Sequence, residues 1–160
     1  MEHIEDGRVR PDVQGTSLRQ GERLVLEENF FTETVLPKSI VRILSPEEMQ
    51  AYRAPYPDQA SRLPILQWPR ELPIEGEPAD VVSVVEGYGT WLAQSSIPKL
   101  FIAANPGAIV VGRARDFCHR WPNQREIAVD GIHFIQEDSP VEIGTALKEF
   151  IGDVQAGAFA

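Results

Sequence analysis

The three histidines of this sequence are its best candidates for acid–base chemistry near neutral pH. His133 stands in a segment, 130–138, that follows an expected strand and precedes an expected helix. Because functional groups in open α/β sheets project from loops at the carboxyl ends of strands, His133 is a candidate general base. The structural alternative is a half-buried loop histidine bonded to a backbone carbonyl. His119 is expected on the surface of an arginine-rich helix, and His3 belongs to an N-terminal leader.

Other reactive residues lack the context that their chemistry requires. Cys118 and His119, with Asp116, are not expected to bind a metal, because helix neighbours point apart and no second cluster completes the coordination sphere. Glu137-Asp138 is interpreted as a solvated helix start rather than an acid pair. No Ser, Asp or Cys occupies the tight strand-to-helix turn that exposes a nucleophile.

The aromatic pair Trp68-Pro69 admits two interpretations. It could line a pocket, but an aromatic ring packed under a proline-rich loop is the favoured interpretation on the residues alone.

The second half of the sequence predicts the elements that would position His133. A helix over 79–94, a buried strand over 97–104, a helix over 112–121, a strand over 126–129 and a last helix after Ser139-Pro140 form the pattern of a parallel α/β sheet. The helix over 79–94 is expected to bury one apolar face. Asn105-Pro106-Gly107 is expected to turn the chain.

The first half predicts helices. The segment 17–37 suggests an interrupted helix, and Ser45-Pro46-Glu47-Glu48 is a strong helix start with a capping box. Six prolines between Pro55 and Pro78 allow only short helical turns and irregular chain there.

Composition narrows the classes of partner. The 160 residues carry a net charge of −9, so neither nucleic acid nor an anionic membrane surface is an expected partner. Cys118 is the single cysteine, which excludes an intramolecular disulfide and fits a cytoplasmic location.

Several segments, in order, carry a family resemblance: Leu24–Phe31, Leu44–Arg53, Trp68–Ile74, Ile97–Ile102, Trp121–Asn123 and Gly131–Asp138. They resemble the C-terminal part of the haloalkane dehalogenases, α/β-hydrolases that cleave carbon–halogen bonds. The resemblance implies a partial α/β-hydrolase fold: a helical cap followed by the last two parallel strands and helices of the core, with the N-terminal core strands missing. It divides the chain into a remnant of the sixth-strand end with an unmatched leader (1–16), a cap domain (17–74) and a core portion (75–160).

The resemblance also implies a reaction in two displacements. An aspartate attacks an sp3 carbon and expels halide, and a histidine then activates the water that hydrolyses the alkyl–enzyme ester. His133 corresponds to that histidine, and Met1-Glu2-His3-Ile4 resembles a Met-Glu-x-Ile motif that makes Glu2 the candidate catalytic acid. Substrate-pocket roles carry over to Phe31, Trp68, Pro69, Leu72, Ala108 and Ile109. No cofactor is implied, and the substrates are a small haloalkane and water.

In the family, the nucleophilic aspartate precedes the position that corresponds to Met1. We therefore expect this sequence to be a truncated reading frame or a fragment that is inactive alone. Its partner would be a missing N-terminal half, or a second copy bound through an open sheet edge. The alternative from another class of function is a non-catalytic module that binds a partner. Epoxide hydrolases and coelenterazine luciferases resemble the same loop, but Leu24–Phe31 and Trp68-Pro69 favour a dehalogenase.

Overall fold

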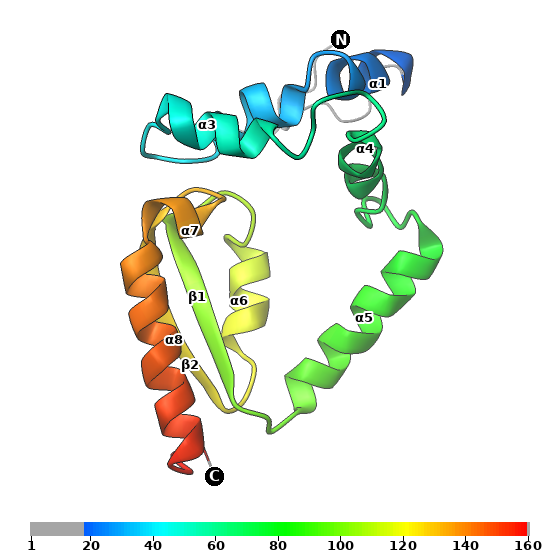
Figure 1. Ribbon diagram of the computed structural model, residues 1–160. Coiled ribbons are helices and arrows are strands. Elements are labelled where there is room, and N and C mark those ends of the chain that lie inside the picture. The colour runs from blue at the N-terminus through cyan, green and yellow to red at the C-terminus, as the bar shows by residue number, and fades with distance from the viewer. Residues whose placement is uncertain (1–17, 160) are drawn as a thin grey trace.

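The computed structural model describes residues 18–159. Its first half is helical, and its second half alternates helices with two strands (Figure 1). The first half contains α1 (Leu18–Leu26), a π-helical turn η1 (Phe31–Val35), α2 (Leu36–Lys38), α3 (Pro46–Arg53) and α4 (Leu63–Arg70). The second half contains α5 (Ala79–Gln94), β1 (Lys99–Pro106), α6 (Arg113–His119), β2 (Gln124–Gly131), α7 (Ile135–Asp138) and α8 (Pro140–Gln155).

Local signals set the start of α3. The Ser45 hydroxyl accepts a hydrogen bond from the Glu48 N–H at 3.2 Å, and the Glu48 carboxylate accepts one from the Ser45 N–H at 2.7 Å. This reciprocal pair is the predicted capping box, with Pro46 at the first helical position. The prediction for this helix is confirmed.

The start of α8 also follows a serine–proline pair, but this serine has another role. This helix begins at Pro140 as expected, but the Ser139 side chain makes no capping bond. Its hydroxyl instead donates to the Asp130 carbonyl at 2.8 Å. Ser139 is buried, and it ties the end of the His133 loop back to the end of β2.

The two strands are parallel, as predicted, and pair from Lys99 with Gln124 to Pro106 with Gly131. β1 therefore continues through the expected turn at Asn105-Pro106, and the chain turns at Gly107. The Gly107 N–H donates to the Gly131 carbonyl at 3.1 Å, which brings the loops after both strands together at one edge. Helices α6 and α8 flank the sheet on opposite sides (Figure 1).

The buried apolar cluster lies between the first half of the chain and the His133 loop. Leu36, Ile40 and Leu44 form its centre, and the half-buried side chains packed against it are Met49, Tyr52 and Phe134. Apolar packing thus fastens the helical half to the loop that follows β2.

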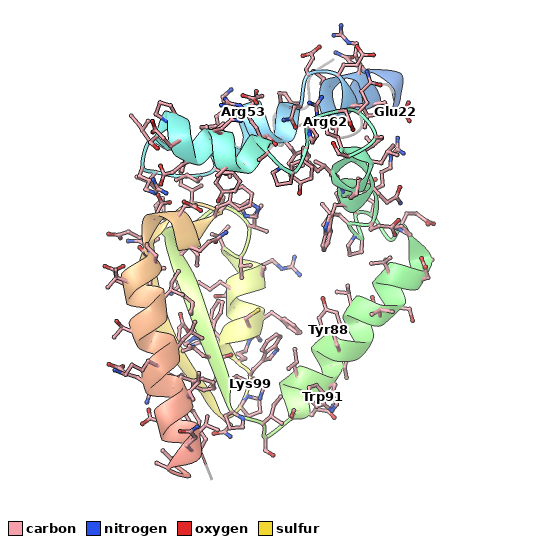
Figure 2. All side chains as sticks on the ribbon, viewed as in Figure 1. Glu22, Arg53, Arg62, Tyr88, Trp91 and Lys99 are labelled. Atoms are coloured by element: carbon pink, nitrogen blue, oxygen red, sulfur yellow. The ribbon has the colours of Figure 1, made fainter. Side chains whose placement is uncertain are left out.

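The prediction that α5 buries one apolar face is wrong. Val84, Tyr88 and Trp91 follow one another at helical spacing on this face and are 65%, 51% and 56% exposed. Figure 2 labels Tyr88 and Trp91 on α5. On α8, Leu147, Ile151 and Val154 repeat the spacing and are also exposed. The physical reason is that a two-stranded sheet is too narrow to cover both helices, although the helices themselves form as their patterns predict.

Candidate active site

His133 lies two residues beyond the end of β2, in the loop where the sequence places it, and it is exposed. Its ring packs against Phe134, with ring centroids 4.5 Å apart. The backbone N–H groups of His133 and Phe134 both donate to the Ser39 carbonyl, each at 3.2 Å. Contacts of the backbone hold the loop, while the imidazole makes no hydrogen bond within residues 18–159.

Gly131 allows the abrupt turn from β2 into this loop. Its φ of +151° lies in a region that side-chain-bearing residues rarely adopt. A Cβ at this position would lie 2.8 Å from Ile135 Cγ2 and 3.3 Å from an Asp138 carboxylate oxygen. The close approach of α7 to the strand end therefore depends on glycine.

Asp138 is anchored to the helical half rather than solvated as predicted. Its carboxylate accepts hydrogen bonds from the Val41 N–H at 2.9 and 3.0 Å and from the Arg42 N–H at 3.0 Å. These donors lie almost a hundred residues upstream, so no local pattern around Asp138 indicates them.

Glu137 departs from the prediction in the same way. Its carboxylate accepts hydrogen bonds from the Arg42 guanidinium and the Tyr52 hydroxyl, and its carbonyl accepts the Arg42 Nε–H at 2.6 Å. The side chain is only 19% exposed. Glu137-Asp138 therefore anchors the His133 loop. Both residues lie in the first turn of α7, as a helix start requires, but the prediction that they are solvated is wrong.

The same guanidinium also binds Glu48. Arg42 Nη1 and Nη2 donate to the two Glu48 carboxylate oxygens at 3.0 and 2.8 Å. This pairing, together with the Ser45 N–H, lowers the pKa of Glu48 to about 2. Hydrogen bonding to Glu48 and Glu137 raises the pKa of Arg42, and bonding to Glu137 raises that of Tyr52.

Arg42 and Tyr52 were missed by reasoning from the sequence. A signal for Arg42 exists, because it interrupts the apolar run Ile40-Val41-Arg42-Ile43-Leu44. A charge inside an apolar run requires a partner when the run is buried. For Tyr52, no local signal distinguishes a hydrogen-bonding role from packing.

The residues predicted to line the substrate pocket are dispersed. Phe31 is half-buried on η1, Trp68 is 73% exposed on α4 beside Pro69, and Leu72 is 49% exposed just after that helix. Trp68 is thus not packed under the proline-rich loop, which was the favoured interpretation. Ala108 and Ile109 are exposed in the loop after β1. Their pocket roles stay predictions.

Cavities border the helical half of the described chain. The larger, of about 560 Å³, is lined by residues that include Glu33 and Arg53, and the smaller, of about 250 Å³, includes Ile40 and Arg42. Neither is lined by His133 or by the predicted pocket residues.

Two further candidate residues, Glu2 and His119, remain. Glu2 lies outside the described residues. His119 is exposed on α6, as expected, and pairs with Glu126. Between residues 18 and 159 no group of three metal-ligating side chains gathers, and no helix is long and apolar enough to cross a membrane.

The fold of the chain is that of the C-terminal part of an α/β-hydrolase. It has two parallel strands with helices on both sides, and a histidine loop that is joined to a helical cap. A haloalkane dehalogenase of Sphingobium indicum is 58% identical to the chain over 132 residues, which is 82% of the chain and 45% of that protein. The crystal structure of the haloalkane dehalogenase DbeA from Bradyrhizobium elkani matches with a TM-score of 0.81 at 42% identity, covering 86% of this chain and 48% of that one. The chain therefore corresponds to the C-terminal portion of the haloalkane dehalogenases.

The chain is also similar to an enzyme that is named for a different activity. A coelenterazine h 2-monooxygenase of Renilla reniformis is 41% identical over 150 residues, 89% of this chain and 47% of that protein. No protein-family model matches the chain. The chain spans about half the length of the curated relatives that it matches.

Proposed function

We propose that this chain supplies the cap and the general base of a haloalkane-hydrolysing enzyme whose attacking aspartate lies on other polypeptide. The observation that carries the proposal is the 58% identity to a haloalkane dehalogenase over 82% of the chain, together with an exposed His133 whose loop is held by backbone hydrogen bonds. His133 takes a proton from water while the water oxygen attacks the ester carbonyl carbon of the alkyl–enzyme intermediate. The ester C–O bond then breaks, the alkoxide takes the proton from the His133 imidazolium and leaves as the alcohol, and the regenerated aspartic acid releases its proton to solvent. Glu2 is the proposed acid that stabilises the imidazolium.

The proposed companion is an N-terminal half of the same fold. Support comes from the apolar faces of α5 and α8, which are exposed although their spacing is that of buried helices. The outer edges of β1 and β2 carry no further strand within residues 18–159, so each can accept one. Without the companion we expect no turnover, because a neutral imidazole is a poor substitute for an aspartate in displacement at carbon.

The proposed function also includes domain bounds, substrate contacts and a location. The cap comprises 17–74 and the core portion 75–160, and substrate contacts come from Phe31, Trp68, Pro69, Leu72, Ala108 and Ile109. A cytoplasmic location is proposed on the single cysteine.

Halide release from 1-haloalkanes tests the proposal. The chain is assayed alone and mixed with the N-terminal half of the Sphingobium indicum relative, whose matched segment is left out. We expect no release from the chain alone, release on mixing, and loss of that release in His133→Ala. His119→Ala is the matched control, because His119 is also exposed but lies on α6. Release by the lone chain, or full activity of His133→Ala in the mixture, would refute the proposal.

A light-emitting activity is the second candidate, and the 41% identity to the Renilla enzyme favours it. The same mixture is supplied with coelenterazine, and emission without halide release would support this candidate. A non-catalytic interaction module predicts that the mixture binds but that His133→Ala is silent in both assays.

A further inference from the structure

Arg42 connects two helices, α3 and α7, that are far apart in the sequence. Its guanidinium contacts the Glu137 carbonyl and carboxylate, on α7, and the Glu48 carboxylate, on α3. Glu137 lies four residues after His133 in the sequence, on α7, which begins two residues after the histidine. Separating α7 from α3 therefore breaks contacts of this one side chain.

The surrounding backbone repeats the connection. The Ser39 carbonyl accepts the His133 and Phe134 N–H groups, and Asp138 accepts the N–H groups of Val41 and Arg42. Residues 39–42 thus hold 133–138 at both ends of the loop. The imidazole of His133 itself makes no hydrogen bond in the described chain, so its placement comes from the backbone of this loop.

We propose that Arg42 is a positioning residue for His133: it fixes the histidine loop against the cap through Glu137, with Tyr52 as the second donor to that carboxylate. The proposal deepens the proposed function and rests on it for the role of His133. Arg42 touches no reacting atom and acts only through the loop.

Arginine suits this position for a geometric reason. Its planar fork binds Glu48 with two nitrogens, and the same side chain still reaches the Glu137 carbonyl through Nε. A lysine ammonium is a single donor centre and cannot span these acceptors together. Arg42→Lys should therefore preserve the charge but lose most of the positioning.

Arg53 offers a matched control. Its Nε and Nη2 donate to the two carboxylate oxygens of Glu33 at 2.7 and 2.8 Å, and its side chain is 40% exposed against 37% for Arg42. Arg53 lies on α3, where Figure 2 labels it, and its ion pair joins α3 to η1 without reaching the His133 loop. Arg53→Met removes the same chemistry from the same part of the chain.

The first test follows amide hydrogen exchange in peptides that contain 133–138, in the chain alone and in the mixture with the N-terminal half. We expect Arg42→Met to speed exchange at His133 and Phe134 by about tenfold or more, since charged hydrogen bonds anchor their loop. Arg53→Met should leave these amides unchanged, and Arg42→Lys and Tyr52→Phe should lie between. Equal exchange in Arg42→Met and Arg53→Met, or no protection at these amides in the unaltered chain, would overturn the proposal.

The second test uses halide release by the mixture. A positioning role lowers kcat in Arg42→Met by about tenfold while KM stays close to its unaltered value, because the side chains proposed to contact the substrate are unchanged. If Arg42→Met does not fold, the same comparison is decided on Arg42→Lys and Tyr52→Phe. If the mixture releases no halide, the proposed function fails, whereas the exchange measurement still decides whether Arg42 orders the loop.

Discussion

Replacing Gly131 by alanine tests the geometry that turns the chain from β2 into the His133 loop. The new methyl carbon would lie 2.8 Å from Ile135 Cγ2 and 3.2 Å from Ile135 Cα. Because one of these atoms is backbone and the other belongs to a β-branched side chain, neither can move away without displacing α7. The φ of +151° adds backbone strain for any residue with a Cβ.

The two costs set the expected magnitude. Overpacking of this kind typically costs about 1–3 kcal/mol, and a strained backbone conformation costs of the same order. Since a shift that relieves one also relieves part of the other, we expect Gly131→Ala to lower the free energy of unfolding by about 2–4 kcal/mol. Gly144→Ala is the matched control, because Gly144 lies within α8 and a Cβ there meets nothing within 4 Å. Gly144→Ala should raise the free energy of unfolding by about 0.4–1 kcal/mol.

Urea unfolding followed by circular dichroism measures both variants against the unaltered chain, with Gly131→Ala also built in the Gly144→Ala background. Hydrogen exchange at the amides of His133 and Phe134 reports the same loop locally. If Gly131→Ala is as stable as the unaltered chain and its loop amides are equally protected, while Gly144→Ala behaves as expected, the argument from close approach is refuted.

Three further predictions address other contacts. Glu48→Gln should remove a stabilisation that is present in the unaltered chain above pH 4.5 and is lost as the pH falls toward about 2, because the folded-state pKa of Glu48 is depressed; urea midpoints across this range test it, with Glu47→Gln as the control. Lys99→Met should cost about 2–3 kcal/mol, because Lys99 is 8% exposed at the start of β1 and its ammonium donates to the carbonyls of Ser95, Ile97 and Pro122 (Figure 2); the same urea titration measures it. The chain alone should be marginally stable and self-associating, because apolar faces and strand edges are open; size-exclusion chromatography and near-ultraviolet circular dichroism check this, and a compact monomer with fixed aromatic signals would contradict it.

The elements were predictable where their signals are local. Ser45, Pro46 and Glu48 specify the start of α3 within four residues, because capping is a contact between near neighbours in sequence. The parallel strands and the position of His133 between β2 and α8 followed from the alternation of helix and strand patterns.

What could not be predicted depends on contacts across the chain. The partners of Glu137 and Asp138 lie in residues 41–52, so the local preference of carboxylates for a helix start indicated solvent where the structure has an anchor. The prediction that α5 buries its apolar face failed for a related reason, because helical periodicity indicates that a face needs a partner and not that the partner is present in the described chain.

These two departures have a common consequence. In the described chain the buried apolar cluster and the hydrogen-bonded carboxylates of Glu137 and Asp138 lie at one junction, between the helical half and the His133 loop. The apolar faces of α5 and α8 stay exposed. When the proposed N-terminal half binds, the His133 loop is therefore already ordered. The N-terminal half then adds strand pairing and covers the apolar helix faces, and it is not needed to order the loop. On this reasoning the strength of complementation should depend on residues such as Tyr88 and Trp91, whereas the rate within the complex should depend on Arg42.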